Sequence, residues 1–462
     1  MRRPFALKGP LGGLLAAALA AAALQVQAAG SVAPATTTTV AVTTTVPATT
    51  STSTSTSTST STTSTTTTST TTTTLAEGPP GFVDQIRASL TDPRFESATV
   101  GLAVWVAGAG MVINHNADVA LRPGSNEKLL VAWGAYGVIG PAATLTTEVK
   151  ADGEVDGNAL RGNLVLVGGG DPSLRSTGPH SIDRLAALVR ARGVTEVTGD
   201  LVVDESRFDD TRRAPGWTER HVPLFVGPLS ALAVDGNYLR SDPEYVTNPA
   251  AGNLAEFRAA LQRHGVTVAG GDRMGAAPEA ASLLTAVDSV PVAQLARSML
   301  TNSDNFYAEM LLKEVGRRAK GKGTVENGVA AVRELAAEAG VQLTGRAADG
   351  SGLSRENSRP AREWAELLVA ARDQPWFDHL LGGLPLAGRS GTLANRFLAT
   401  SGEANVRGKT GSVRATRALS GYLTTAGGRQ VVFSLVVNSD PLPPAVLGAM
   451  DGLVASMAAS RA

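Results

Sequence analysis

The sequence predicts an α/β protein of the α+β type, in which an antiparallel sheet is flanked by helices and a smaller α/β domain is inserted. Apolar runs at 98–106 and 111–113 lie on either side of a glycine turn and predict a hairpin near the start of the folded chain. A second hairpin is predicted near the end, where runs at 418–423 and 430–437 flank Gly427-Gly428. Because both ends supply strands to one sheet, we expect the middle of the chain to be an insertion.

Helices are predicted on both sides of this sheet. Apolar residues at helical spacing open the folded part at 82–90, and a second helical pattern at 446–457 closes it. The domain built from the two chain ends is therefore expected to comprise residues 79–143 and 285–462.

The middle of the chain has a different pattern. Apolar runs at 164–167 and 200–204 flank a helical pattern at 182–192, and strand, helix, strand is typical of a small α/β unit. We place this inserted domain at 144–284. The glycines at 168–170 are interpreted as a structural turn, because no Gly-Lys-Ser/Thr follows them to bind a phosphate.

The N-terminus has the pattern of a secretory signal. Basic residues at positions 2, 3 and 8 precede an apolar run at 11–24, which small residues follow. We therefore predict a signal peptide at 1–29. The run is shorter than the roughly 20 residues that cross a bilayer, so no stable membrane span is expected. Whether the signal is cleaved or acts as an anchor is left open.

Residues 30–78 are predicted to be a disordered linker, because they are dominated by threonine and serine and offer too little apolar area to offset the entropy of ordering. Whether this linker is O-glycosylated is left open. Signal and linker together predict a secreted, extracytoplasmic protein.

Composition excludes several classes of partner and chemistry. Lys+Arg and Asp+Glu number 41 each, so the net charge is zero, and no basic run is suited to nucleic acid. The chain has no cysteine, which excludes disulfides and thiol chemistry. No cofactor and no metal are expected, since the histidines show no paired ligand spacing; they are at positions 115, 180, 221, 264 and 379.

Ser125 and Lys128 form the first chemical motif. They are expected one turn apart on the same face of a helix that continues through Tyr136. A helix N-terminus favours a developing alkoxide, and the lysine can act as a base if burial or a second cation lowers its pKa. Alone the motif is weak, because about one such spacing is expected by chance in a chain of this length. A capping serine is the alternative.

Two further motifs follow. Ser303 and Asn305 flank Asp304 between helical patterns at 292–300 and 306–315, in an interhelical loop of the kind that often carries function. An ordinary capping turn is the alternative.

The third motif, Lys409-Thr410-Gly411-Ser412, follows Gly408 on a predicted strand edge. A lysine and a hydroxyl there suit an anionic carboxylate on a peptide that runs along the edge. A solvated turn lysine is the alternative.

The three motifs in this order are the set shared by penicillin-binding proteins and class A β-lactamases. Around them the chain resembles the D-Ala-D-Ala carboxypeptidase/endopeptidase branch of the low-molecular-mass (class C) penicillin-binding proteins, from about residue 82 to 440. The stretches that carry this resemblance are Gly162–Pro172, Gly199–Asp204, Pro215–Trp217, Asn305–Leu312, Asp349–Arg355, Leu384–Gly388 and Ser420–Ala426.

The resemblance implies a penicillin-binding/β-lactamase-like transpeptidase fold and a serine-type hydrolase. It implies that Ser125 is the acylated nucleophile, that Lys128 takes its proton, that Ser303 passes a proton to the leaving amine, and that Asn305 orients Lys128. The substrate-binding residues would be Lys409, Thr410, Gly411 and Ser412.

The implied partners are peptidoglycan stem peptides ending in D-Ala-D-Ala and, as covalent inhibitors, β-lactam antibiotics. The balance of carboxypeptidase and endopeptidase activity, the third peptide residue and the oligomeric state are left open. The resembling proteins tend to carry acidic residues just after Gly-Trp, whereas Trp217 is followed here by Thr218-Glu219-Arg220. The preferred peptide side chain is therefore not predicted.

Two other functions remain open at this point. A β-lactamase would share the acylation machinery, although no Glu-x-x-Leu-Asn segment stands out as its deacylating glutamate. A catalytically inactive homologue would bind peptidoglycan without cutting it, although all the motif side chains are present. A Ser-His-Asp hydrolase is less favoured, because the chain has no Gly-x-Ser-x-Gly elbow.

Overall fold

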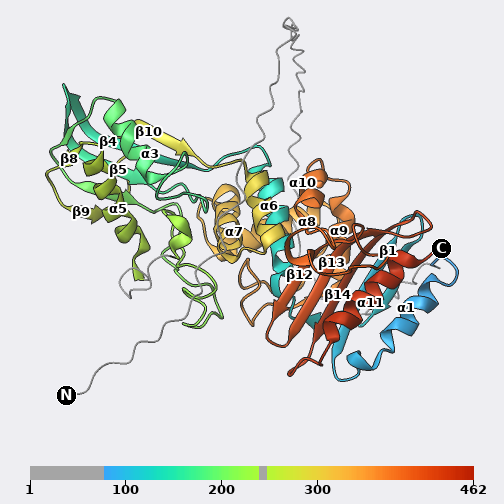
Figure 1. Cartoon of the computed structure of the whole chain (residues 1–462). Coiled ribbons are helices and arrows are strands. Elements are labelled where there is room, and N and C mark those ends of the chain that lie inside the picture. The colour runs from blue at the N-terminus through green and yellow to red at the C-terminus, as the bar shows by residue number, and fades with distance from the viewer. Residues whose placement is uncertain (1–77, 239–246, 462) are drawn as a thin grey trace, which may run out of the picture. The chain divides into compact units, whose positions relative to one another are not determined.

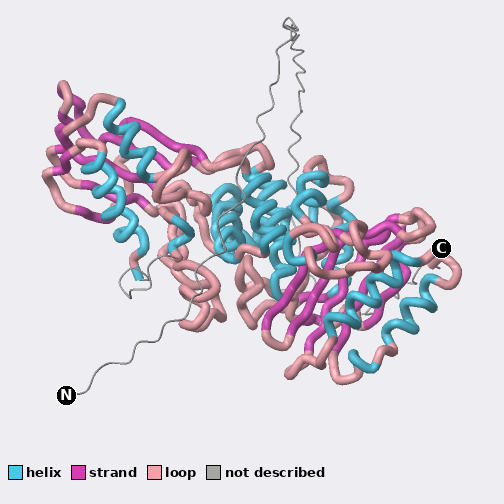
Figure 2. The backbone as a smooth tube through the Cα atoms, in the orientation of Figure 1, coloured by secondary structure: helices cyan, strands magenta, loops and turns pink. Residues whose placement is uncertain are grey.

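The structure is a computed structural model, and it describes residues 78–238 and 247–461. The signal peptide predicted at 1–29 and, apart from Gly78, the linker predicted at 30–78 lie outside the described residues. Within the described ranges, no helix combines the length and the apolar character needed to cross a membrane. Figure 2 shows that the strands gather into separate sheets.

The first sheet is antiparallel and has the order β12-β13-β14-β1-β2. Its strands come from both ends of the folded chain, and both predicted hairpins are confirmed. The strands are β1 (Thr99–Val106), β2 (Gly110–His115), β12 (Arg407–Val413), β13 (Thr416–Thr424) and β14 (Gln430–Asn438).

This sheet is covered on both faces. In β14, Val431 and Phe433 face α1 (Phe82–Leu90) and α11 (Val446–Ala459), whereas Val432 belongs to the core on the opposite face. Side chains of a strand alternate between faces, so a strand buried on both sides is a continuous apolar run. Figure 1 shows α1 and α11 together over one face of the sheet.

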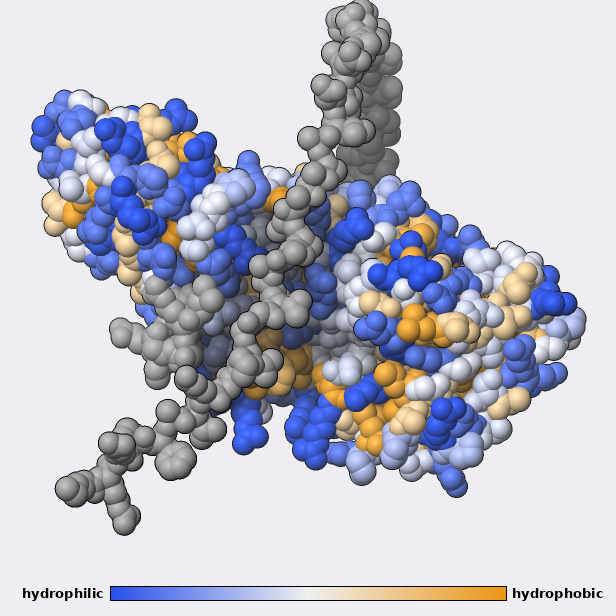
Figure 3. Space-filling model, viewed as in Figure 1, coloured by the Kyte–Doolittle hydropathy of each residue, from blue (hydrophilic) through white to orange (hydrophobic). Residues whose placement is uncertain are grey.

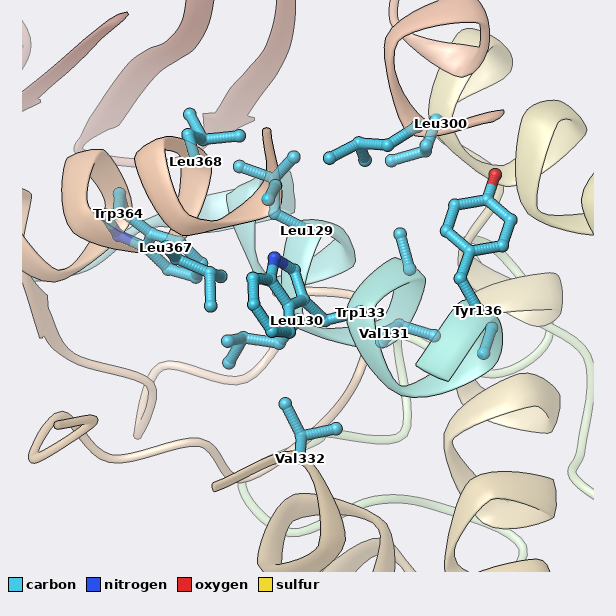
Figure 4. Close-up of a cluster of buried hydrophobic side chains, with 14 of the residues drawn as sticks. Leu129, Leu130, Val131, Trp133, Tyr136, Leu300, Val332, Trp364, Leu367 and Leu368 are labelled. Atoms are coloured by element: carbon cyan, nitrogen blue, oxygen red, sulfur yellow. The ribbon is translucent and has the colours of Figure 1, made fainter. Parts of the chain in front are cut away.

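The opposite face carries the helices that hold the site. The central one is α2 (Lys128–Gly134), which is buried along its whole length. Trp133 of α2 packs edge-on against Trp376, with the ring centroids 5.0 Å apart. Figure 4 shows Leu129, Trp133 and Trp364 within this core. The surrounding helices are α6 (Val292–Asn302), α7 (Asn305–Lys320), α8 (Val325–Glu338), α9 (Ala361–Ala371) and α10 (Phe377–Gly383).

A second, mixed sheet is built from the middle of the chain. Its order is β10-β4-β5-β6-β8, with β7 between β5 and β9. Its strands are β4 (Thr146–Asp156), β5 (Ala159–Val167), β6 (Glu196–Val197), β7 (Leu201–Asp204), β8 (Thr267–Val268), β9 (Asp272–Met274) and β10 (Ser282–Asp288). The boundary expected at 284 falls within β10, which pairs with β4, so this sheet extends to residue 288.

Two helices, α3 (Ile182–Ala191) and α5 (Pro249–Arg263), share a buried apolar cluster with the second sheet. Figure 3 shows mostly hydrophilic side chains on the visible surface of this region. β3 (Ala120–Leu121), which precedes α2 in the chain, forms a short antiparallel pair with β11 (Arg359–Pro360), which directly precedes α9.

Candidate active site

Ser125 lies in a tight turn rather than in the helix itself. The turn is a 3₁₀ helix (Gly124–Glu127) that leads directly into α2. Gly124 has φ +52°, and a Cβ there would lie 3.3 Å from the backbone nitrogen of Ser412. Glycine therefore lets the turn approach β12, so that Ser125 and Ser412 line the same cleft of about 920 Å³.

Lys128 is fully buried beneath this cleft. Its Nζ donates to Ser125 Oγ at 3.0 Å, to Asn305 Oδ1 at 2.8 Å and to the carbonyl oxygen of Ser351 at 2.6 Å. Burial lowers the pKa of Lys128 to about 8, against the opposing effect of nearby carboxylates such as Asp349. A lysine with this pKa is partly neutral near neutral pH and can then take a proton from a hydroxyl.

Ser303 lies between α6 and α7, as predicted, whereas Asn305 is the first residue of α7, so the interhelical loop is shorter than the sequence predicts. Ser303 ends α6 in the left-handed region, with φ 60°. Asp304 caps α7, because its carboxylate accepts a hydrogen bond from Tyr307 N at 3.0 Å. The capping role falls to Asp304, so the Ser303 hydroxyl is left to face the cleft and Asn305 to face Lys128.

Lys409 is the second fully buried lysine of the site. It lies on the edge strand β12, and its Nζ donates to Ser303 Oγ and to the Thr410 carbonyl oxygen, both at 2.9 Å. Burial and the charge of Lys128 lower its pKa well below the ordinary value for lysine. The charge of Lys128 therefore reaches Lys409 and disfavours the charged form of that lysine.

The remaining residues of the third motif continue along β12. Thr410 Oγ1 donates to Thr392 Oγ1 at 2.7 Å. A Cβ at Gly411 would lie 2.3 Å from the carbonyl oxygen of Pro123, so only glycine allows β12 to pass the Ser125 turn this closely. Ser412 is exposed in the cleft. The structure thus brings all three predicted motifs to one cleft.

Sequence reasoning assigned no role to the loop at 349–354, which supplies an acceptor for Lys128. This loop is held by two buried carboxylates. Glu309 accepts from Ser351 N at 2.7 Å, and Asp349 accepts from Gly352 N at 2.8 Å and from Ser354 N at 2.6 Å. The sequence of this loop contributed to the resemblance, but the group that contacts Lys128 is a backbone carbonyl, which no residue type reveals.

The open side of the cleft is strongly basic. Among its described lining residues, Asp440 is the single acid, and it lies 3.6 Å from Arg414. The arginines that line the cleft are Arg122, Arg220, Arg355, Arg414 and Arg417. A cleft lined by charges of one sign raises the local concentration of ligands of the opposite sign.

The fold is that of a penicillin-binding protein. The crystal structure of penicillin binding protein 4 from Haemophilus influenzae matches with a TM-score of 0.73 and 20% identity, over 82% of this chain and 99% of that one. The model of the D-Ala-D-Ala carboxypeptidase 3 (S13) family matches residues 82–245 and 239–457. This chain belongs to that family.

Characterised relatives agree with the family assignment. A D-alanyl-D-alanine carboxypeptidase of Actinomadura sp. (strain R39) is 31% identical over 82% of this chain and 85% of its own length. A carboxypeptidase of Mycobacterium tuberculosis is 33% identical over 74% of this chain and 76% of its own. The family favours a peptidase over the β-lactamase and the inactive homologue that the sequence alone left open.

Proposed function

We propose that this protein is a serine-type carboxypeptidase that hydrolyses the D-Ala-D-Ala bond of peptidoglycan stem peptides through an acyl-enzyme on Ser125. The same site would also cut cross-linked stem peptides. The observation that carries the proposal is the buried amine of Lys128, which lies 3.0 Å from Ser125 Oγ and has a pKa lowered to about 8. A base with a pKa near the working pH is suited to removing the serine proton.

The reaction follows from the positions of these groups. Neutral Lys128 takes the proton of Ser125 as Oγ attacks the penultimate D-alanyl carbonyl. The resulting oxyanion would be held by the backbone N–H groups of Ser125 and Ser412. Ser303, whose Oγ lies 2.9 Å from Lys409 Nζ, gives its hydroxyl proton to the leaving nitrogen as the C–N bond breaks and D-alanine departs. The proton that Lys128 took from Ser125 then restores the Ser303 hydroxyl and leaves Lys128 neutral. Water then hydrolyses the Ser125 ester and restores the hydroxyl.

Binding of the substrate is assigned to the strand side of the cleft. Lys409 and Thr410 would hold the terminal carboxylate, while Gly411 and Ser412 let the peptide run along the edge of β12. The five lining arginines support a substrate with several carboxylates, as a peptidoglycan stem peptide has.

The site is also proposed to be acylated by β-lactams. The crystal structure of penicillin binding protein 4 from Haemophilus influenzae, which has a similar fold, has also been solved in complex with a β-lactam. Such a substrate and such an inhibitor imply an extracytoplasmic location, and the N-terminal signal predicted at 1–29 supports export.

We further propose the division of the chain that the sequence predicts. Residues 79–143 and 285–462 would form the catalytic domain, and the domain predicted at 144–284 would be an insertion that continues through β10. The separate sheet and the separate apolar cluster of the inserted region support this division.

The test is to incubate the purified protein with benzylpenicillin and to map the adduct by peptide mass spectrometry. We expect one modified residue, Ser125, and we expect release of D-alanine from a pentapeptide substrate. An adduct on Ser303 or Ser351 would refute the assignment. Rapid turnover of a chromogenic cephalosporin without peptide hydrolysis would favour a β-lactamase instead.

A further inference from the structure

Three oxygen atoms surround the amine of Lys128: Ser125 Oγ, Asn305 Oδ1 and the Ser351 carbonyl oxygen. A neutral amine has two N–H donors and one lone pair, so it can donate to only two of these oxygens. Asn305 Oδ1 and the Ser351 carbonyl oxygen carry no hydrogen, so each must accept from Lys128. When these two acceptors take both N–H groups, the lone pair is left for the hydroxyl of Ser125. The groups that fix the positions of these two acceptors therefore determine whether the lone pair of Lys128 points at Ser125.

The first acceptor is fixed by a residue from the middle of the chain. Asn305 Nδ2 donates to the carbonyl oxygen of Phe225 at 2.9 Å. An amide side chain has one donor end and one acceptor end, so this bond turns Oδ1 toward Lys128. Without it, a rotation of the Asn305 amide would point two N–H donors at the lysine.

The second acceptor is fixed from the same part of the chain. Trp217 Nε1 donates to Asp349 Oδ2 at 2.8 Å, and that oxygen also accepts from Ser354 N. Gly216 has φ +78°, and a Cβ there would lie 2.3 Å from Ser354 Oγ, so glycine is needed for this close approach. Trp217 thus supports the loop that presents the Ser351 carbonyl.

Residues 205–231, which contain both Trp217 and Phe225, are called the bracing segment below. This segment is anchored to α7, the helix that begins at Asn305. Arg207 makes a bidentate pair with the fully buried Glu314, at 2.8 Å for both bonds. Buried Lys313 pairs with Asp209.

An apolar contact reinforces these ion pairs. Phe208 and Val226 of the bracing segment share a buried cluster with Phe306 and Met310 of α7. Phe306 directly follows Asn305, so this cluster packs next to the residue whose side-chain amide accepts from Lys128. The segment is therefore held rigidly against both supports of Lys128.

We propose that the bracing segment is a positioning element for the general base, because it holds both acceptors that direct the Lys128 amine toward Ser125. This inference rests on the proposed function, in which Lys128 takes the proton of Ser125. It assigns to the inserted region a role in the reaction itself. These contacts act on the reaction through Lys128. Trp217 is therefore a positioning residue, as is the backbone of Phe225, which orients Asn305.

The test removes one hydrogen bond and keeps an aromatic ring at the position. Trp217→Phe removes the donor to Asp349, and Trp105→Phe, on β1, is the matched control. We expect Trp217→Phe to slow the limiting rate of benzylpenicillin acylation about 10- to 100-fold, the size of loss that small misplacements cause. We also expect the acidic limb of the pH–rate profile to move to higher pH, because a looser site admits water and restores the charged form of Lys128.

A second pair of variants tests the anchor. Arg207→Ala breaks the pair with Glu314. Its control is Arg273→Ala on β9, which breaks the exposed pair of Arg273 with Asp200. We expect the same shift of the acidic limb in Arg207→Ala only. Thermal unfolding is measured for all four variants, since a merely structural contact would lower the melting temperature and leave the limb in place.

Amide hydrogen exchange gives a readout that does not depend on chemistry at Ser125. In Trp217→Phe we expect faster exchange of the Gly352 and Ser354 amides, which donate to Asp349. An unchanged acidic limb together with unchanged exchange would overturn the proposed brace. A wild-type protein without a Ser125 adduct would instead refute the proposed function, and exchange alone would then decide whether the brace exists.

Discussion

The cleft has a buried floor, formed by Lys128 and Lys409, and an exposed rim that includes Arg414. The two differ in how their charges are solvated. On the floor, Lys128 and Lys409 are fully buried, each makes fixed hydrogen bonds, and burial lowers the pKa of both. On the rim, the side chain of Arg414 is 75% exposed and its pair with Asp440 is long. A desolvated charge changes its protonation state, whereas an exposed charge is screened. Proton transfer therefore belongs to the floor, where Lys409 is also proposed to contact the substrate carboxylate, and long-range attraction of the substrate belongs to the rim.

The strongest test of this contrast is Lys128→Arg. A guanidinium stays charged at every accessible pH and cannot take a proton from Ser125. We expect acylation to be abolished, a loss of at least the 10²- to 10⁴-fold that general-base catalysis typically contributes. Pre-steady-state acylation by benzylpenicillin across pH is the measurement. An active Lys128→Arg protein would show that the base has been misassigned.

The second test distinguishes the two buried lysines. Lys409 is proposed to act by its charge on the substrate carboxylate, so Lys409→Arg should keep partial activity with a higher KM. Lys409→Ala removes the like charge beside Lys128, which should let the Lys128 pKa rise above about 8. The base acts only when neutral, so its activity falls below this pKa, and the acidic limb should move to higher pH.

Burial is the largest cause of the lowered pKa of Lys128, so the shift in Lys409→Ala should remove only a minor part of that lowering. The rate profiles of wild type, Lys409→Arg and Lys409→Ala are compared at saturating peptide. An acidic limb that stays in place in Lys409→Ala would mean that the two lysines do not influence each other.

Much of the fold was predictable because its strands and helices have strong periodic patterns. The runs at 98–106 and 430–437 are apolar on both faces of a doubly covered sheet, and they became β1 and β14. By contrast, β4 and β10 were not predicted. In β10 the single buried residue is Thr285, and the buried positions of β4 include Thr147 and Ala151, so both strands give a weak apolar signal.

In the candidate site, the side chains were predictable from the sequence and the backbone groups were not. The motif residues Ser125, Lys128, Asn305 and Lys409 were predictable, because their chemistry depends on residue type and spacing. The acceptors at Ser351 and Phe225 were not, because each is a backbone carbonyl placed by contacts far away in the sequence. Their roles follow only from the folded arrangement.

The rim should give the smallest effect, and it tests the other side of the comparison. Arg414→Gln removes one charge from the cleft while keeping a long polar side chain. An exposed charge pair is typically worth 0.2–1 kcal/mol, so we expect kcat/KM for a stem peptide to fall about 1.4- to fivefold. The loss should appear in KM, because Arg414 is exposed at the rim and makes no contact with Ser125 or Lys128. It should also shrink as salt rises toward about 1 M, where the Debye length is about 3 Å.

Arg273→Gln, which changes an exposed arginine outside the cleft, is the matched control and should leave KM unchanged at every salt concentration. If the loss in Arg414→Gln instead appeared in kcat and did not depend on salt, Arg414 would act in the chemistry, and the separation of floor from rim would fail at this residue.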